Sequence, residues 1–283
     1  MSTIAVQHTF KPVIENLELG THTLALYRWP QPGKHIKASV MLVHGLGEHM
    51  GRYNHLAYVL HQAGYEVMAY DHIGHGLSSG ERGDIDQSNR LTEDLKTVIA
   101  YVHNSETKLV LLGHSMGGLV VARAMAEQPD IADAVVMSSP ALAAYTTLLD
   151  KLLLCVLPRW FAHVRVDNKL ELNWLSRDAQ VVREYKQDKR VHRKISSGLA
   201  AWIIEQGIGA LKEAPAWHKP ALLLYAGQDR LVNPKGSADF ANAVPKEFLQ
   251  SHCFNVMYHE VFNDPEKTFV FSKLIEWLDL RYA

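Results

Sequence analysis

The stretch LVLLGHSMGGLVVARAMAEQ, residues 109–128, decides the fold of this chain. It passes from a continuously apolar run through a glycine-rich turn around Ser115 into a segment with helical periodicity. A nucleophile on a strained turn from strand to helix needs small neighbours, and Gly113, Gly117 and Gly118 supply them. The alternative is a glycine-rich turn whose serine only caps the helix. The apolar and helical flanks favour Ser115 as a nucleophile.

Short runs typical of β-strands recur on both sides of this stretch, bounded by Gly, Asp, Ser or Pro. Several of them, such as SVMLV at 39–43, are apolar throughout, as parallel strands covered on both faces require. The predicted strands are Thr23–Trp29, Ala38–His44, Glu66–Tyr70, Lys108–Leu112, Ala134–Met137, Ala221–Tyr225 and Cys253–Tyr258. Helical periodicity between them, as at 91–102, predicts a doubly wound α/β fold with a mostly parallel central sheet. Ligands of such folds lie beyond the carboxyl ends of the strands.

The alternation of strand and helix breaks once, from about residue 141 to 219, where helical patterns follow one another without a strand. We expect one domain over residues 1–283 with a helical cap inserted there, because no linker or repeat separates the parts. The cap contains the run Leu152–Leu157, which is apolar on all sides. It suits contact with an acyl chain or a lipid surface, whereas core packing or a dimer contact would also explain it. The cap residues predicted to make this contact are Leu149, Leu152, Leu153 and Val156.

The overall composition argues against several classes of function. Lysine and arginine total 29 against 30 for aspartate and glutamate, so no net charge attracts nucleic acid. The two cysteines, Cys155 and Cys253, allow at most one disulfide, which fits a reducing compartment. Residues 1–12 lack a signal-peptide core, and no run of roughly 20 apolar residues could span a bilayer. We therefore expect a cytoplasmic protein, with peripheral contact to the inner face of the membrane through the cap.

A serine nucleophile needs a base, and in α/β-hydrolases the partners follow along the chain in the order Ser, Asp, His. Asp229 is the second residue after the apolar run ALLLYAG at 221–227, so its carboxylate should lie at the same sheet edge as Ser115. A turn aspartate or an ion pair with Arg230 is the alternative, and Asp264 would then be the substitute. We predict that Asp229 orients the base.

The base must be chosen among 16 histidines, so a lone histidine is weak support. His259 directly follows the predicted strand at 253–258, at the edge where Ser115 is expected. His252 precedes that predicted strand and would lie at the opposite edge. We therefore predict that His259 is the general base.

A tetrahedral intermediate also needs N–H donors aimed at its oxyanion. The Met116 N–H opens the helix after the nucleophile, where the helix dipole adds partial positive charge. The second donor is predicted to be the Leu46 N–H, in the loop after the predicted strand at 38–44. Beside that loop, Glu48 and Arg52 either form an ion pair that holds it or are ordinary charged residues of a first helical turn.

The motifs of this chain together resemble one known family. They are HGLGEH at 44–49 with Arg52-Tyr53, DHIGHGLS at 71–78, GHSMGG at 113–118 and YHE at 258–260. They resemble those of monoacylglycerol lipases and the related bacterial lysophospholipases, from about Ser39 to Leu278. The resemblance implies that the serine, aspartate and histidine act as predicted and that Leu46 and Met116 supply the two N–H donors. Tyr258 departs from the small residue that often precedes the histidine in that family, which bears on the pocket on the glycerol side.

Together these residues predict hydrolysis of the ester bond of a single-chain lipid through an acyl-enzyme, with monoacylglycerol first and lysophospholipid second. A broad carboxylesterase or a peptidase on the same core is a rival. A ligand-binding relative without turnover is another, because a fold does not determine a function. No metal or organic cofactor is needed for this chemistry, and no cluster of ligand residues suggests one.

Overall fold

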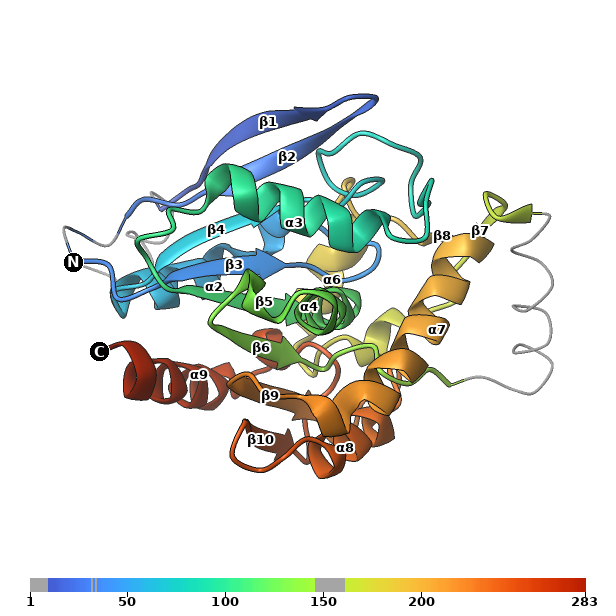
Figure 1. Ribbon diagram of the computed structural model, residues 1–283. Helices are drawn as coiled ribbons and strands as arrows, with labels where there is room; N and C mark the ends of the chain where they lie inside the picture. Colours follow the sequence, from blue (N-terminus) through green and yellow to red (C-terminus); the bar gives the residue numbers. More distant parts are fainter. Residues whose placement is uncertain (1–9, 32, 34, 146–160) are drawn as a thin grey trace.

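The computed structural model describes residues 10–31, 33, 35–145 and 161–283. An eight-stranded sheet in the order β1-β2-β4-β3-β5-β6-β9-β10 forms its centre (Figure 1). Strand β2 is antiparallel to both β1 and β4, and every pair from β4 to β10 is parallel. The strands are β1 Val13–Leu19, β2 His22–Arg28, β3 Ser39–Val43, β4 Glu66–Tyr70, β5 Leu109–His114, β6 Ala134–Ser138, β9 Ala221–Ala226 and β10 Leu249–Phe254. The predicted mostly parallel α/β sheet is confirmed.

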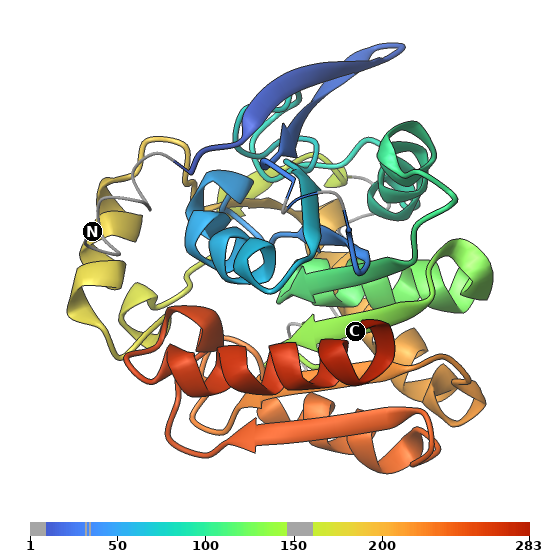
Figure 2. The same cartoon turned by 90° about the vertical axis from the view of Figure 1, so that its left-hand side faces the viewer.

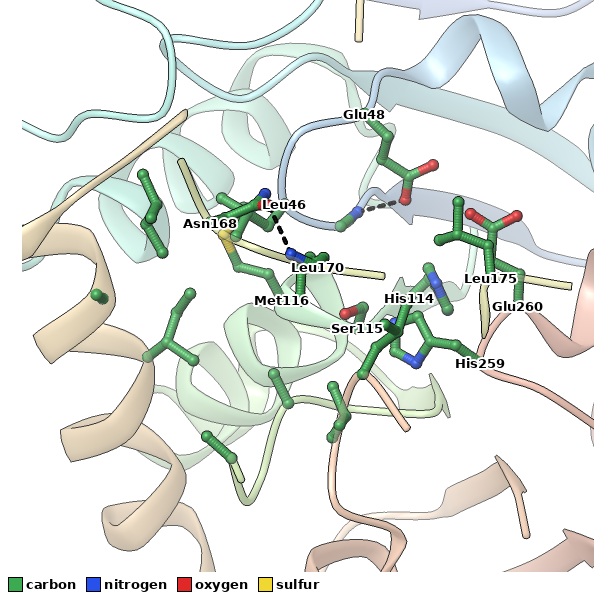
Figure 3. A pocket seen from close by; sticks show the side chains of 18 of the residues that line it. Leu46, Glu48, His114, Ser115, Met116, Asn168, Leu170, Leu175, His259 and Glu260 are labelled. Atoms are coloured by element: carbon green, nitrogen blue, oxygen red, sulfur yellow. Dashed lines mark hydrogen bonds between the residues drawn. The ribbon is translucent and has the colours of Figure 1, made fainter. Parts of the chain in front are cut away.

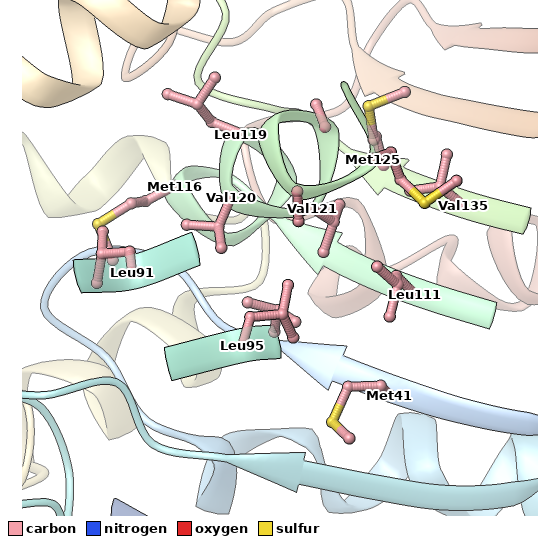
Figure 4. Packing of buried hydrophobic residues seen from close by; sticks show 14 of the residues in the cluster. Met41, Leu91, Leu95, Leu111, Met116, Leu119, Val120, Val121, Met125 and Val135 are labelled. Carbon is pink, nitrogen blue, oxygen red and sulfur yellow. The ribbon is translucent and has the colours of Figure 1, made fainter. Parts of the chain in front are cut away.

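Helices cover both faces of the sheet, as the apolar central strands require. Successive side chains of a strand point to opposite faces, so in β3 Met41 packs on one face and Leu42 on the other. On the face of Met41 lie α3 (Arg90–Val102), α4 (Met116–Glu127), α7 (Ser197–Glu213) and α8 (Pro234–Ala243). Figure 4 shows part of this layer, in which α3 and α4 pack over β3, β5 and β6.

The opposite face is covered by α2 (Asn54–Gln62) and α9 (Lys267–Tyr282), whose Leu60 and Trp277 are fully buried. Figure 2 shows α9 in red along the sheet, with the β1–β2 hairpin projecting at the other edge. The short 3-10 helices are η1 Met50–Tyr53, η2 Pro129–Ile131, η3 Leu172–Trp174, η4 Ala214–Ala216 and η5 Val261–Asn263. Among the described helices, none has both the length and the apolar character needed to cross a bilayer.

The described residues between β6 and β9 lie beyond the carboxyl ends of the central strands (Figure 1). They contain α6 (Ala179–Gln187) and α7, and also the antiparallel strands β7 (Arg165–Asp167) and β8 (Lys194–Ser196). The expectation that this segment contains no strand was therefore wrong. Strands of three residues are too short to display an alternating pattern. The predicted lipid-contact residues Leu149, Leu152, Leu153 and Val156 lie outside the described residues.

Two edge strands also differ from the prediction. β1 was not expected, because it is half exposed and carries polar residues, with Val13 70% accessible. β10 covers Leu249–Phe254 and not 253–258, since its parallel register runs from Leu249 opposite Ala221 to Phe254 opposite Ala226. Polar side chains are tolerated along an outer strand, so the apolar run did not mark where it begins. His252 consequently lies within β10, and the premise that it precedes the strand was wrong.

Candidate active site

Ser115 occupies the turn between β5 and α4 with φ 54° and ψ −118°. A positive φ in a residue other than glycine costs about 1–3 kcal/mol, so the surrounding structure must hold it. The Ser115 N–H donates to the Ser138 carbonyl at 2.9 Å, and the Ser115 carbonyl accepts from the Leu119 N–H at 3.1 Å. A Cβ on Gly117 would lie 2.5 Å from the His44 carbonyl oxygen, so this position needs glycine. The tight turn presents the serine at the sheet edge.

Asp229 and His259 are joined by a short, buried hydrogen bond. His259 Nδ1 lies 2.6 Å from Asp229 Oδ2, with the two side chains 5% and 3% exposed. The other carboxylate oxygen, Oδ1, accepts the N–H groups of Leu231 and Val232, both at 2.9 Å. Each oxygen of Asp229 is therefore held in place, one by the chain and one by the imidazole. Figure 3 shows His259 beside Ser115 in one cavity.

The electrostatics around His259 favour its charged form. Burial lowers the pKa of His259, but the charge and hydrogen bond of Asp229 outweigh burial and raise it above its usual value. Glu260 and Glu48 raise the pKa further, by smaller amounts. The site thus stabilises an imidazolium that forms when His259 accepts a proton.

The two alternative residues are placed elsewhere. Asp264 is buried and pairs with Arg177 through both oxygens, at 2.6 and 2.8 Å. His252 points from β10 to Gln250, with 3.0 Å between His252 Nε2 and the amide nitrogen. The structure therefore brings Asp229 to His259, and it brings neither alternative there. From the sequence, the choice of Asp229 over Asp264 and of His259 over His252 depended only on the sheet edge at which each residue was expected.

The loop after β3 is held by the His44 ring. His44 Nε2 accepts the His72 N–H at 3.0 Å, so the ring proton is on Nδ1, which lies 2.7 Å from the Gly45 carbonyl oxygen. In a planar trans peptide the N–H points opposite to the C=O, so the Leu46 N–H points away from the His44 ring. Leu46 and Met116 both border the cavity that contains Ser115 (Figure 3). This geometry suits the pair of N–H donors that an oxyanion needs.

Glu48 and Arg52 belong to a buried charged network that also contains Glu260. Arg52 donates to Glu48 at 2.5 Å and to both oxygens of Glu260 at 2.7 Å. Glu48 accepts in addition the Gly45 N–H and the Tyr53 hydroxyl, each at 2.7 Å. The network therefore ties the loop after β3 to the residue that follows the predicted base.

The surroundings favour the charged form of each member of this network. Burial raises the pKa of Glu48, but Arg52, with His114, His44 and the Tyr53 hydrogen bond, lowers it to about 2. Burial also raises the pKa of Glu260, and Arg52 again outweighs it and lowers the value. Two carboxylates and one guanidinium leave one negative charge in excess at this end of the cavity.

The cavity has a volume of ≈ 190 Å³ and is mostly apolar. Its polar end contains Ser115, His259, Glu48 and Glu260, and its remaining walls come from α4, from the segment between β6 and β9, and from the loop after β9. The apolar wall residues include Leu46, Met116, Leu170, Leu175, Ile195, Ile203, Ile204, Leu231 and Val232. Within the described part of the chain, no three His, Cys, Asp or Glu side chains are grouped to hold a metal ion.

Residues 34–266 match the Hydrolase_4 family, described as "Serine aminopeptidase, S33". The chain belongs to this family. The α/β-hydrolase is 35% identical over 244 residues to the monoacylglycerol lipase of Mycolicibacterium smegmatis, covering 84% of this chain and 87% of that protein. It is 34% identical to an uncharacterized abhydrolase domain-containing protein of Dictyostelium discoideum, over 92% of this chain but only 28% of that protein's length.

A solved structure agrees with this assignment. The monoacylglycerol lipase of Paleococcus ferrophilus is 36% identical and superposes with a TM-score of 0.82, covering 89% of this α/β-hydrolase and 98% of that chain. The predicted fold class and the resemblance to monoacylglycerol lipases are thereby confirmed. This chain is a hydrolase of a family that contains lipases and esterases of that type.

Some residues of the site in this α/β-hydrolase were not predicted from the sequence. Glu260 was quoted only as part of a motif, although its place directly after His259 was a signal for a role beside the base. Tyr185 packs its ring 4.5 Å from the Arg52 guanidinium carbon and borders the cavity. Asn168 borders it as well, near Leu46 and Met116 in Figure 3. Nothing in the sequence around 168 distinguished Asn168 from other polar positions, whereas Tyr185 lies within the stretch from Leu175 to Asp188, which resembles the family.

Proposed function

We propose that this chain is a serine esterase that hydrolyses single-chain lipid esters, with monoacylglycerol as the first substrate class. Ser115 attacks the ester carbonyl and His259 takes its proton, while Asp229 stabilises the imidazolium. The Leu46 and Met116 N–H groups stabilise the oxyanion. The alcohol leaves with the proton from His259, and water then releases the fatty acid from the acyl-enzyme. The observation that carries the proposal is the 2.6 Å Asp229–His259 contact beside Ser115 in an apolar cavity.

The shape and polarity of the cavity support a lipid substrate. Its walls consist mostly of apolar side chains, such as those of Leu46 and Val232, and such walls suit an aliphatic acyl chain. The carboxylates of Glu48 and Glu260 at the other end can accept hydrogen bonds from hydroxyl groups of an alcohol. A relative and a solved structure that resemble this chain bear the name monoacylglycerol lipase.

Charge at the polar end favours monoacylglycerol over lysophospholipid. The network of Glu48, Arg52 and Glu260 has one negative charge in excess and is buried, so it is weakly screened. A phosphate next to it would meet like charge in a region of low dielectric, whereas glycerol brings no charge. We therefore place lysophospholipids second.

A peptidase is the rival that the family description supports. An amide substrate differs from an ester in its leaving group, so amino-acid p-nitroanilides and p-nitrophenyl esters separate the two activities. A ligand-binding relative without turnover would release no alcohol from either substrate. Rapid release of p-nitrophenol from an ester, with no cleavage of the anilides, supports the esterase.

We also propose that the chain forms one domain whose cap, at about 141–219, docks at a lipid surface. The proposal starts from the apolar run Leu152–Leu157 in the sequence. Among the residues that follow this run in the chain, Phe161, Val164 and Val166 are 56%, 51% and 55% exposed. Apolar side chains that project from a surface in this way are typical of contact with a partner or a membrane. Replacing Leu153 and Leu154 by Ser should weaken co-sedimentation with lipid vesicles and leave hydrolysis of a short soluble ester nearly unchanged. A lower melting temperature with loss on every substrate would instead show that the run packs in the core.

The central experiment compares esters that share one acyl chain. The enzyme should turn over the 1-monoacylglycerol faster than the lysophosphatidylcholine, and a serine-directed fluorophosphonate should label Ser115 alone. Ser115→Ala is the control and should abolish both turnover and labelling. Labelling at another residue, or full turnover by Ser115→Ala, contradicts the mechanism. Faster turnover of the lysophospholipid would reverse the proposed order of the two substrates and leave the serine mechanism unchanged.

A further inference from the structure

Trp174 contacts the sequence neighbours of both Asp229 and His259. The Arg230 guanidinium carbon lies 4.0 Å from the centre of the Trp174 ring, and Arg230 directly follows Asp229. The rings of Trp174 and Tyr258 are 4.7 Å apart between centroids at 55°, and Tyr258 directly precedes His259. One indole from the segment between β6 and β9 thus touches the two loops that carry the predicted aspartate and base.

Hydrogen bonds between main-chain groups join these two loops only as far as Gln228 and Met257, which lie before Asp229 and His259. The Gly227 N–H donates to the Phe254 carbonyl at 2.9 Å, and the Gln228 N–H donates to the Met257 carbonyl at 3.1 Å. Beyond Gln228 and Met257 the two loops are joined by the hydrogen bond between Asp229 and His259 itself, at 2.6 Å. The Trp174 ring adds a further contact between the two loops beside this bond, through Arg230 and Tyr258.

The chain around Trp174 is fastened to the histidine loop. The Trp174 carbonyl accepts the His259 N–H at 3.3 Å, and the Leu175 carbonyl accepts the Glu260 N–H at 2.8 Å. Two residues further on, Arg177 pairs with the buried Asp264 at 2.6 and 2.8 Å. These bonds hold the segment against one loop, whereas the side chain of Trp174 reaches the other loop as well.

We propose that Trp174 is a positioning residue, whose ring couples the loop of Asp229 to the loop of His259 and thereby sets the contact between the two side chains. This inference rests on the proposed function, because it assumes that this contact serves catalysis. The aromatic ring of Trp174 acts through Arg230 and Tyr258 and touches no reacting atom. The segment between β6 and β9 then contributes to the geometry of the catalytic groups as well as to the walls of the cavity.

The reaction rate should be sensitive to the position of these loops because the Asp229–His259 hydrogen bond is short. At 2.6 Å a small displacement of either loop weakens it, and misplacement of catalytic groups by about 1 Å can cost about a hundredfold in rate. The other groups that face His259 are the Glu260 and Glu48 carboxylates and the His114 ring, whose centroid is 4.8 Å away. Asp229 is the strongest of the groups that raise the pKa of His259, so a looser contact lowers that pKa.

The test compares Trp174→Ala with the conservative Trp174→Phe. In Trp174→Ala we expect kcat to fall about fivefold to fiftyfold with little change in KM, as loss of a cation–π and an aromatic contact implies. The acid limb of the pH–rate profile should move to lower pH by about half a unit or more. Trp174→Phe should keep most of kcat and the original midpoint, because an aromatic ring remains.

Two further variants keep the test decisive. Arg177→Ala removes an ion pair that fastens the same segment but leaves both ring contacts of Trp174 in place, so it should shift the midpoint much less than Trp174→Ala. Arg230→Ala removes an exposed partner of the ring and should shift the midpoint in the same direction as Trp174→Ala. The double variant of Trp174 and Arg230 should be no worse than Trp174→Ala, because the two residues act through one contact. An equal shift in Arg177→Ala, or additive losses in the double variant, overturns the inference.

The titration of the His259 imidazole, followed by NMR without substrate, gives a readout that does not depend on the reaction. Its midpoint should fall in Trp174→Ala and in Arg230→Ala and move much less in Arg177→Ala. A shifted midpoint in an enzyme that hydrolyses no ester contradicts the proposed function and leaves the positioning role standing. An unshifted midpoint in folded Arg230→Ala and Trp174→Ala, with esterase activity present, contradicts the positioning role alone.

Discussion

The His44 ring offers a sharp test of how the oxyanion loop is held, because its two nitrogens do different work. Nδ1 donates to the Gly45 carbonyl at 2.7 Å, and Nε2 accepts the His72 N–H at 3.0 Å. The ring is fully buried. Asn places an amide N–H near the position of Nδ1, whereas Gln places a carbonyl oxygen near that of Nε2. Each variant therefore keeps one of the two hydrogen bonds.

The two variants should lose similar stability and very different activity. Each leaves one buried backbone group without its partner, which costs about 1–3 kcal/mol and so lowers Tm by several degrees. His44→Gln releases the Gly45 carbonyl, so the Gly45–Leu46 peptide can rotate and the Leu46 N–H is no longer aimed. Loss of one oxyanion donor costs about 10²–10³ in kcat, and that range is the upper bound for His44→Gln. His44→Asn should retain most of kcat.

The measurement is steady-state hydrolysis of a short soluble p-nitrophenyl ester, together with the thermal midpoint from circular dichroism. A short ester excludes effects of lipid aggregation, and the paired variants share the loss of the imidazole ring. If His44→Gln kept wild-type kcat while His44→Asn lost it, the tautomer assignment would be reversed. If both kept kcat, the ring would have no part in aiming the Leu46 N–H.

Four further predictions rest on the same geometry. Asp229→Asn should lower kcat by about 10⁴, whereas Asp264→Asn, which loses only an ion pair, should mainly lower Tm; the reverse pattern would refute the choice of aspartate. Activity should fall on acidification with a midpoint above the ordinary pKa of histidine, because His259 must be neutral and its pKa is raised. Stability from protonated His259 is full below the unfolded pKa and is lost as pH rises through the folded one, so Tm in His259→Gln should show a weaker decline with pH. Gly117→Ala should abolish folding or activity, because its Cβ would overlap the Val43 carbonyl oxygen, and a folded, active variant would refute the need for close approach.

The strand-to-helix turn was readable from the sequence because its signals are local. Continuous apolar runs are typical of strands covered on both faces. Glycine is needed at 113 and 117 because a Cβ at either position would meet backbone atoms. The predicted roles of Ser115, Asp229 and His259 then rest on the order in which α/β-hydrolases place these residue types along the chain. The outer strands gave no such signal, since β1 and β10 tolerate polar side chains on their open sides.

The sequence by itself therefore determined the fold class, the turn that carries Ser115 and the carboxyl edge at which the chemistry is expected. Only the tertiary structure decided which side chains meet there. Whether Glu48 pairs with Arg52 was open in the sequence, and the partner that completes the network, Glu260, lies more than two hundred residues away in the chain. The contacts of the Trp174 ring with Arg230 and Tyr258 likewise join residues that are far apart in the chain. Periodicity and spacing report local geometry, whereas contacts between distant segments depend on how the layers of the fold pack together.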